Sequence, residues 1–265
     1  MRLRDRDVPS AAVHVQGLLC GGELVPGWST TEVTAAEDVV LGVGKVLGEP
    51  VGYASEKSGV LVQHVFPVEA EASAPSNESS SFELDLHTEL VFSRRHPDRP
   101  MDALCPDFIV LACLRGDPDA RTVVVSNRAV VASLGRSDAD LLRAPLFQLQ
   151  APYSFTRDGD RSRPWVGPVP LLTGPASDPC LAVDLACGTR AVSANGERAL
   201  GALRRAVAPA ARRVEIELET GDVLVLDNRR CLHGRSSFRA RFDDSDRWLL
   251  RSYVRSSLDP TGRIL

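Results

Sequence analysis

The chain has 265 residues, of which 43% are hydrophobic and 25% are charged, and its formal net charge is −4. These values are those of an ordinary globular protein that is long enough to bury a substantial core. A slightly acidic chain with a pI near 5.8 lacks the basic surface that nucleic-acid binding requires, so we expect no nucleic-acid partner.

Cysteine spacing and the lengths of the apolar runs argue against two further classes of protein. The six cysteines are scattered and include no Cys-x-x-Cys pair, which disfavours a structural zinc site and a disulfide framework. No apolar run approaches the roughly 20 residues that span a bilayer. The first residues also lack the apolar segment of a signal peptide. We therefore expect a cytoplasmic protein without a membrane partner.

The N-terminal third is predicted to contain one helix and one strand, followed by a loop. Residues 29–32 have the capping-box pattern that begins a helix, and apolar residues recur at helical spacing through 30–48. A run of apolar and β-branched residues predicts a strand over 59–68. The stretch around 69–82 is rich in Ser, Ala, Pro and Asn. It predicts a mobile loop, placed where a lid would lie over a site.

Short strands dominate the rest of the chain. Apolar runs predict paired strands over 108–114 and 122–125, joined by a Gly-Asp-Pro-Asp turn. The other expected elements are two short helices within 127–143, a loop with one hairpin over 150–180, a strand over 180–185, a helix over 195–213, and strands over 214–218, 222–226 and 248–254. Many short strands, few helices and Gly/Pro-rich joints predict one mainly β domain spanning 1–265, a sandwich or jelly roll with flanking helices.

His87 and Glu89 are the first candidate site residues. Side chains two residues apart on an extended segment point the same way, so this His-x-Glu pair presents two ligand atoms to one side. A second histidine, brought in from a distant part of the chain, would complete the two-His-one-carboxylate set that binds non-haem Fe(II). Such a pair also occurs by chance, so by itself it does not establish a metal site.

His233 is the candidate for the third ligand among the five histidines. It follows a buried strand that ends in a polar turn, and Gly234 comes directly after it. Further along, Arg247 comes just before the last predicted strand and Arg251 lies on that strand, four residues later. Their even spacing places both arginine side chains on the same face of that strand.

Four blocks of sequence follow one another in a recognisable order: 87–89, 108–122, 221–235 and 246–251. Together they resemble the clavaminate synthase-like branch of the Fe(II)/2-oxoglutarate-dependent oxygenases, within the TauD/TfdA superfamily. The resemblance extends from about residue 50 to residue 255, and the block around His233 is its most specific part. The branch includes arginine, asparagine and lysine hydroxylases of bacterial peptide-antibiotic pathways. The resemblance implies a double-stranded β-helix, or jelly-roll, core.

The resemblance also implies cofactors and the residues that bind them. His87, Glu89 and His233 would bind Fe(II) and leave coordination positions for 2-oxoglutarate and the co-substrate O2. Arg247 would pair bidentately with the distal carboxylate of 2-oxoglutarate, and Thr122 would hydrogen-bond to the same carboxylate. The implied reaction hydroxylates an unactivated C–H bond while 2-oxoglutarate is converted to succinate and CO2.

Three further residues are implied substrate contacts. Arg251 matches the arginine that meets the substrate α-carboxylate. Glu56 stands where amino-acid hydroxylases have an acidic residue followed by a glutamine, a pair that contacts the substrate amine; here Lys57 replaces the glutamine. Asp184 lies where relatives present an acidic residue to the far end of a basic substrate. From the residues alone, three of the implied roles have an alternative outside the site. Arg251 could form an ion pair on the outer face of its strand, Thr122 could be an ordinary strand residue, and Asp184 could be a turn residue.

The chain departs from the family pattern after the His-x-Glu pair, where an additional stretch around 93–106 would remodel one wall of the site. We expect a hydroxylase that acts on a small molecule, an amino acid or an amino-acid-derived intermediate, in bacterial specialised metabolism. Desaturation, ring closure or a substrate held on a carrier protein is compatible with the same cofactors. A non-catalytic jelly-roll binding protein is the remaining alternative.

Overall fold

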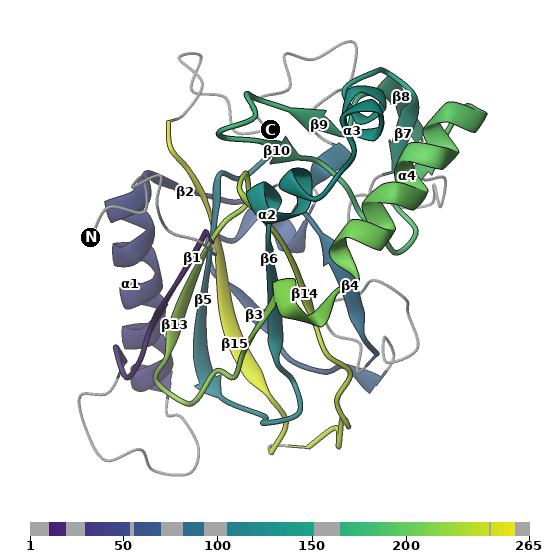
Figure 1. The fold of residues 1–265 in the computed structure, drawn as a ribbon. Coiled ribbons are helices and arrows are strands. Elements are labelled where there is room, and N and C mark those ends of the chain that lie inside the picture. The colour runs from purple at the N-terminus through teal and green to yellow at the C-terminus, as the bar shows by residue number, and fades with distance from the viewer. Residues whose placement is uncertain are drawn as a thin grey trace.

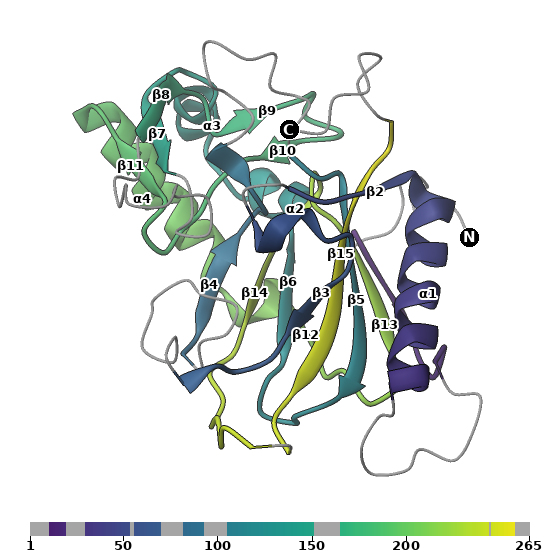
Figure 2. The same ribbon diagram turned by 180° about the vertical axis from the view of Figure 1, so that it is seen from behind.

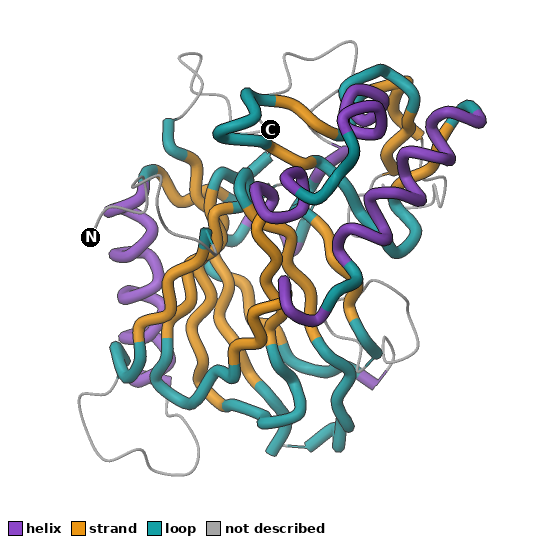
Figure 3. Tube along the Cα trace, viewed as in Figure 1, coloured by secondary structure: helices purple, strands orange, loops and turns teal. Residues whose placement is uncertain are grey.

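The computed structural model describes residues 11–19, 30–53, 56–69, 82–92, 105–150, 165–243 and 245–257. In this part of the chain two antiparallel sheets pack against each other, and helices cover their outer faces (Figure 1). The view from behind shows β3 lying along β15 (Figure 2). Strands make up the centre of the molecule, as predicted, and the helices lie at its periphery (Figure 3).

The larger sheet has six strands in the order β1-β13-β5-β15-β2, with β3 also paired to β15. Every pairing in it is antiparallel. Its strands are β1 (Ala12–Val15), β2 (Glu49–Val51), β3 (Gln63–Val65), β5 (Phe108–Arg115), β13 (Val223–Asp227) and β15 (Trp248–Arg255).

The smaller sheet has four strands in the order β12-β6-β14-β4. They are β4 (Leu84–His87), β6 (Thr122–Ser126), β12 (Arg213–Ile216) and β14 (Cys231–Arg235). Two accessory sheets lie beyond its end. They consist of β7 (Phe147–Gln150), β8 (Trp165–Val169) and β11 (Thr189–Ala191), and of β9 (Leu172–Thr173) and β10 (Cys180–Leu181).

The described helices are short apart from two. The set consists of α1 (Thr30–Leu47), α2 (Asn127–Ala132), α3 (Arg136–Leu142) and α4 (Ala194–Val207), with single 3-10 turns at Lys57–Gly59 and Ala210–Arg212. Helix α4 begins at an N-cap, where the hydroxyl of Ser193 accepts a hydrogen bond of 3.1 Å from the amide of Gly196. No described helix has the length and apolar character needed to cross a membrane.

Alternation along the strands separates the core into layers. Ile109 and Leu249 pack between the two sheets, whereas their neighbours Val110 and Leu250 pack on the opposite face, against α1. The smaller sheet has the same arrangement, since Val125 packs with α4 on its outer face. Among the described residues, side chains from both sheets therefore line the space between the sheets together.

Several predicted elements are shorter than their patterns indicated. The helix predicted over 195–213 ends at Val207, because Pro209 cannot continue it. The strand predicted over 59–68 is reduced to β3, because the preceding 57–59 segment turns, with a φ of +59° at Ser58. Of the strand predicted over 180–185, only Cys180–Leu181 pairs as a strand.

The two loop predictions fall mostly on residues that the structure does not describe. The predicted lid around 69–82 includes 70–81, and the predicted insertion around 93–106 includes 93–104, and both stretches lie outside the described residues. The proposed capping residue Ser29 lies outside them as well. These expectations stay predictions.

Strand β1, which the sequence pattern did not reveal, is attached to the larger sheet by a buried carboxylate. Asp222 is 3% exposed. One of its oxygens accepts from the amide of Gly17 at 2.9 Å, and the other lies 2.8 Å from Nε2 of His14 and 3.1 Å from the amide of Glu219. Three groups from two segments therefore depend on one side chain.

Replacing this side chain is expected to destabilise the protein. Asp222→Ala removes the three contacts that its buried carboxylate makes with His14, Gly17 and Glu219, so the free energy of unfolding should fall by about 1–3 kcal/mol, measured by urea denaturation. Asp140→Ala, at an exposed position of α3, is the matched control and should change the free energy by less than about 0.5 kcal/mol. Equal stability of the two variants would contradict the assigned role of Asp222.

Candidate metal centre

His87 and His233 face each other across two neighbouring strands. They are direct Cα partners in the pairing of β4 with β14, and their ring centroids lie 4.4 Å apart. Gly234 permits this approach, because a Cβ at that position would lie 2.5 Å from the carbonyl oxygen of Leu84. His233 was expected after a buried strand and a polar turn, and the structure places it within the next strand, β14, where the sheet fixes its direction.

Glu89 completes a cluster of three possible ligands. It lies two residues beyond the end of β4, and Leu90, with a φ of +52°, turns the chain directly after it. The oxygen Oε2 of Glu89 lies 4.0 Å from Nε2 of His87 and 3.7 Å from Nε2 of His233. One ligand atom from each of the three residues lies within 4.8 Å of the other two, so a single ion can contact all three.

The protonation states of the cluster suit a cation. Nδ1 of His87 lies 2.8 Å from the carbonyl oxygen of Asp85, which places the proton on Nδ1 and leaves the lone pair of Nε2 facing Glu89. Burial and the neighbouring His87 lower the pKa of His233 to about 4. Burial alone would raise the pKa of Glu89, but the hydrogen bond with His233 and the charge of Arg251 outweigh it and lower the pKa to about 2. At neutral pH the site therefore holds neutral imidazole at His233 and a carboxylate.

The chemical nature of the three donors fits Fe(II). Two imidazole nitrogens and one carboxylate oxygen form the set that binds non-haem iron while leaving other coordination positions open. Zinc sites of structural type use four protein ligands, commonly with thiolates, and no cysteine is part of this cluster.

Asn228 supports Glu89 and was not identified from the sequence. Its side chain is fully buried, and its Oδ1 accepts a hydrogen bond of 2.7 Å from the amide of Glu89. Its Nδ2 donates to the carbonyl oxygens of Glu89 at 3.2 Å and of Pro106 at 2.9 Å. The Asn228 side chain thus binds both backbone groups of Glu89 and fixes the position from which its carboxylate projects.

Arg251 crosses from the larger sheet toward this cluster. It is 8% exposed, so its side chain points inward and the outer-face alternative does not apply. Its guanidinium lies 3.4 Å from Glu56, 3.9 Å from Glu89 and over the ring of Tyr253. Gln63 accepts a hydrogen bond of 3.2 Å from Arg251 Nε and donates one of 3.4 Å to Glu56.

Gln63 is a second residue that the sequence did not single out. Its side chain donates to Glu56, whereas Lys57, which follows Glu56 in the sequence, is exposed and donates to the carbonyl oxygen of His64 at 3.2 Å. The ammonium group of Lys57 therefore does not share the buried position of Glu56.

Asp184 lies close to the cluster through its backbone. It forms an isolated bridge with His87, and its own amide donates to the hydroxyl of Thr189 at 2.9 Å. Its carboxylate accepts from the amide of Ala186 at 2.9 Å. These contacts stabilise a turn, and a role for Asp184 in binding a substrate stays a prediction.

Thr122 lies on the inner face of the smaller sheet, and Arg247 directly precedes β15 of the larger sheet. Thr122 is 3% exposed and lies two residues from Val124, the Cα partner of His233, so both side chains are on one face of the smaller sheet. Arg247 is 7% exposed, and burial lowers its pKa to about 10. No residue in the described part of the chain forms a hydrogen bond or an ion pair with Arg247, although a buried guanidinium ordinarily has an anionic partner.

The sequence model of one protein family, the taurine catabolism dioxygenase TauD, TfdA family, matches residues 15–253 of the chain. The chain belongs to this family. It is 36% identical over 217 residues to the L-lysine 3-hydroxylase of Catenulispora acidiphila, a match covering 80% of this chain and 56% of that protein. It is 33% identical over 218 residues to clavaminate synthase 2 of Streptomyces clavuligerus, a match covering 80% and 62% of the two chains.

A solved structure extends the comparison to the fold. The crystal structure of an asparagine oxygenase with Fe(II), (2S,3S)-3-hydroxyasparagine and succinate is similar with a TM-score of 0.78 and 32% identity, covering 96% of this chain and 77% of that one. The predicted TauD/TfdA membership and jelly-roll fold class are confirmed. The expected cofactors are those bound in a second similar structure, the non-haem iron oxygenase OrfP with Fe and α-ketoglutaric acid, at 31% identity and a TM-score of 0.69. The chain spans 56% and 62% of the length of the two curated relatives above.

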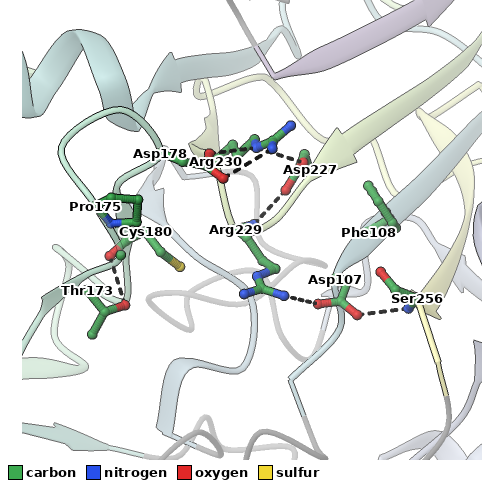
Figure 4. Close-up of a pocket in the computed structure, with 11 residues that line it drawn as sticks. Asp107, Phe108, Thr173, Pro175, Asp178, Cys180, Asp227, Arg229, Arg230 and Ser256 are labelled. Carbon is green, nitrogen blue, oxygen red and sulfur yellow. Dashed lines mark hydrogen bonds and ion pairs between the residues drawn. The ribbon is translucent and has the colours of Figure 1, made fainter. Parts of the chain in front are cut away.

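A separate cavity of about 320 Å³ lies at the turn between β13 and β14 of this TauD/TfdA-family fold (Figure 4). Its two arginines are paired with carboxylates, Arg229 with Asp107 at 3.4 Å and Arg230 with Asp178 at 2.9 Å. None of the three clustered ligand residues lines it. The cavity and the metal centre nevertheless share a support, because Asn228 belongs to the same turn.

Loss of the Asn228 side chain is expected to weaken metal binding. Asn228→Ala removes the hydrogen bonds that fix the backbone of Glu89, and lost support of a metal ligand typically weakens affinity by about 10–100-fold. Calorimetric titration of the apo-protein with Fe(II) under anaerobic conditions measures the change. Asn195→Ala, at an exposed position of α4, should leave the affinity unchanged. A full-affinity Asn228→Ala variant would show that Glu89 needs no such support.

Proposed function

We propose that the protein is an Fe(II)/2-oxoglutarate-dependent oxygenase that hydroxylates an unactivated C–H bond of an amino acid or an amino-acid-derived small molecule. The observation that carries the proposal is the His87–Glu89–His233 cluster between the two sheets. The names of its relatives, among them L-lysine 3-hydroxylase and asparagine oxygenase, support an amino-acid-like substrate. We further propose that it acts in the cytoplasm, in bacterial specialised metabolism of the antibiotic type.

In this proposal the clustered residues hold the iron. His87, Glu89 and His233 bind Fe(II) on one side. The Glu89 carboxylate and the His233 imidazole are already deprotonated at neutral pH, so neither has to lose a proton when the metal binds. When bound, Fe(II) and 2-oxoglutarate supply the oxidising chemistry, in which 2-oxoglutarate and O2 yield succinate, CO2 and one hydroxyl group on the substrate. The residues of the chain orient the reactants and exclude water.

Arg247 and Thr122 bind the distal carboxylate of 2-oxoglutarate. A buried guanidinium that lacks an ion pair within the described chain is stabilised by an anion that enters the pocket. Thr122 contributes a hydroxyl from the smaller sheet, and its side chain lies on the same face of that sheet as His233. The two groups thus set the direction in which 2-oxoglutarate enters the space between the sheets.

Arg251, Glu56 and Gln63 bind the amino-acid end of the substrate. An amino acid is a zwitterion, and the buried Arg251–Glu56 pair offers one charge of each sign within 3.4 Å. The substrate carboxylate meets Arg251, and the substrate ammonium meets Glu56, with Gln63 holding both side chains in place. Asp184 is proposed to contact the far end of the substrate.

Turnover of 2-oxoglutarate tests the proposal directly. Succinate release should require Fe(II) and should increase when the correct amino acid from a panel is added. His233→Ala should abolish it, because one of three ligands is lost, whereas His14→Ala, at the edge strand β1, should retain it. A product heavier than the substrate by one oxygen atom supports hydroxylation, and a loss of two hydrogens indicates desaturation. Iron-independent turnover would refute the proposal.

Arg251→Lys tests the substrate pocket separately. Lysine keeps the charge but loses the planar fork that pairs bidentately with a carboxylate. We expect kcat/KM for the amino-acid substrate to fall by about tenfold or more, equivalent to about 1.4 kcal/mol, with KM for 2-oxoglutarate nearly unchanged. Arg190→Lys, on the exposed side of β11, is the control. An equal loss for both substrates would place Arg251 in the support of Glu89 instead.

A further inference from the structure

The buried carboxylate of Asp246, directly before Arg247, has no role in the site described above. Asp246 is 4% exposed, and its oxygens accept hydrogen bonds from three successive backbone amides. The amide of Arg241 donates at 2.9 Å and that of Asp243 at 3.3 Å, and the amide of Phe242 also donates. Hydrogen bonds to a carboxylate are stronger than those between neutral groups. One side chain therefore fixes this loop to the residue that precedes Arg247.

The loop depends on this carboxylate for its shape. Phe242 has a φ of +58°, a left-handed conformation that residues other than glycine adopt rarely and at a cost. Phe242 is 42% exposed, so packing of its ring does not account for this conformation. A turn of this kind directs successive N–H groups to one point and forms a concave site for an anion. The carboxylate of Asp246 occupies that site.

Further contacts hold the backbone on both sides of Arg247. Nη1 of Arg115, at the end of β5, donates to the carbonyl oxygen of Asp246 at 3.0 Å. On the other side Trp248 begins β15, and its indole Nε1 donates to Nδ1 of His64 at 3.1 Å. Arg247 itself is buried and forms no ion pair with a described residue. The contacts thus fix the backbone from which Arg247 projects and leave its guanidinium available for a ligand.

We propose that Asp246 is a positioning residue for 2-oxoglutarate: by fixing the loop before β15, its carboxylate holds Arg247 in place to bind the distal carboxylate of the co-substrate. The inference rests on the proposed function. Arg247 contacts the ligand, and Asp246 acts through Arg247. A guanidinium on an ordered backbone loses less conformational freedom when it binds, so the ligand is bound more tightly. Without the Asp246 side chain, ligand binding also has to order the loop.

The dissociation constant of 2-oxoglutarate tests this role. It is measured by calorimetry on protein loaded with Mn(II) in place of Fe(II), so that no turnover occurs. Asp246→Ala should raise the constant by about tenfold or more, and Asp246→Asn, which keeps one acceptor oxygen, should raise it by about threefold. The affinity for Mn(II) should stay unchanged in both variants, because the three ligand residues are untouched.

The matched control is Asp243→Ala, in the same loop. Asp243 is exposed, and its carboxylate accepts hydrogen bonds from the amide and the hydroxyl of Ser245. Its replacement removes an aspartate side chain from the loop but keeps the acceptor for the three amides. The dissociation constant of 2-oxoglutarate should therefore stay at the wild-type value.

Kinetics distinguish positioning from a general loss of structure. In Asp246→Ala, KM for 2-oxoglutarate should rise, while kcat at saturating 2-oxoglutarate and KM for the amino acid that stimulates turnover stay near their wild-type values. A merely structural role would lower the melting temperature and leave the 2-oxoglutarate affinity of the folded protein unchanged.

The outcomes separate the possible errors. A wild-type protein that binds no 2-oxoglutarate would overturn the proposed function itself. Wild-type affinity in a folded Asp246→Ala variant would leave that function intact and overturn the role of Asp246, and so would an equal loss of affinity in Asp243→Ala. If Asp246→Ala does not fold, Asp246→Asn decides, because an unchanged dissociation constant in the folded asparagine variant overturns the inference.

Discussion

The register between β4 and β14 is the constraint on which the rest of the site depends. It makes His87 and His233 direct partners, although 146 positions separate them in the sequence. A slip by one residue would turn one of the two rings to the outer face of the sheet, because side chains alternate. Gly234 protects this register, since a larger residue would collide with the carbonyl of Leu84. The strand pairing thus decides whether a metal centre exists.

Charges are distributed unequally along the space between the sheets. Near the metal centre, Arg251 lies among two carboxylates, so this part of the pocket carries both signs and suits a zwitterion. Arg247, next to β15, is buried and forms no ion pair with a described residue, so its surroundings suit an anion. The two ligands of the proposed reaction differ in the same way, an amino acid on one side and a dicarboxylate on the other. Electrostatic complementarity therefore separates their positions.

Some of these features followed directly from the sequence, because they depend on residue type and on local order. The His-x-Glu pair and the block around His233 indicated the ligand set and the family, and the short apolar runs indicated a mainly β fold. Arg247 was identified from its place in the family pattern. Local sequence patterns predicted a strand least well where the strand that it pairs with is distant in the sequence. Strand β1 was missed, because Asp222 and β13, more than 200 positions away, order it.

The sequence by itself determined the fold class, the family and the kind of metal that the three ligands suit, since these follow from residue chemistry and motif order. Tertiary structure decided which residues surround the three ligands. Only folding brings Gln63 to Glu56 and Asn228 to Glu89. Each of these relations joins different strands or turns, and burial then raises the energetic cost of any polar group or charge left without a partner. Sequence spacing does not encode such neighbours, because they depend on strand register and sheet packing.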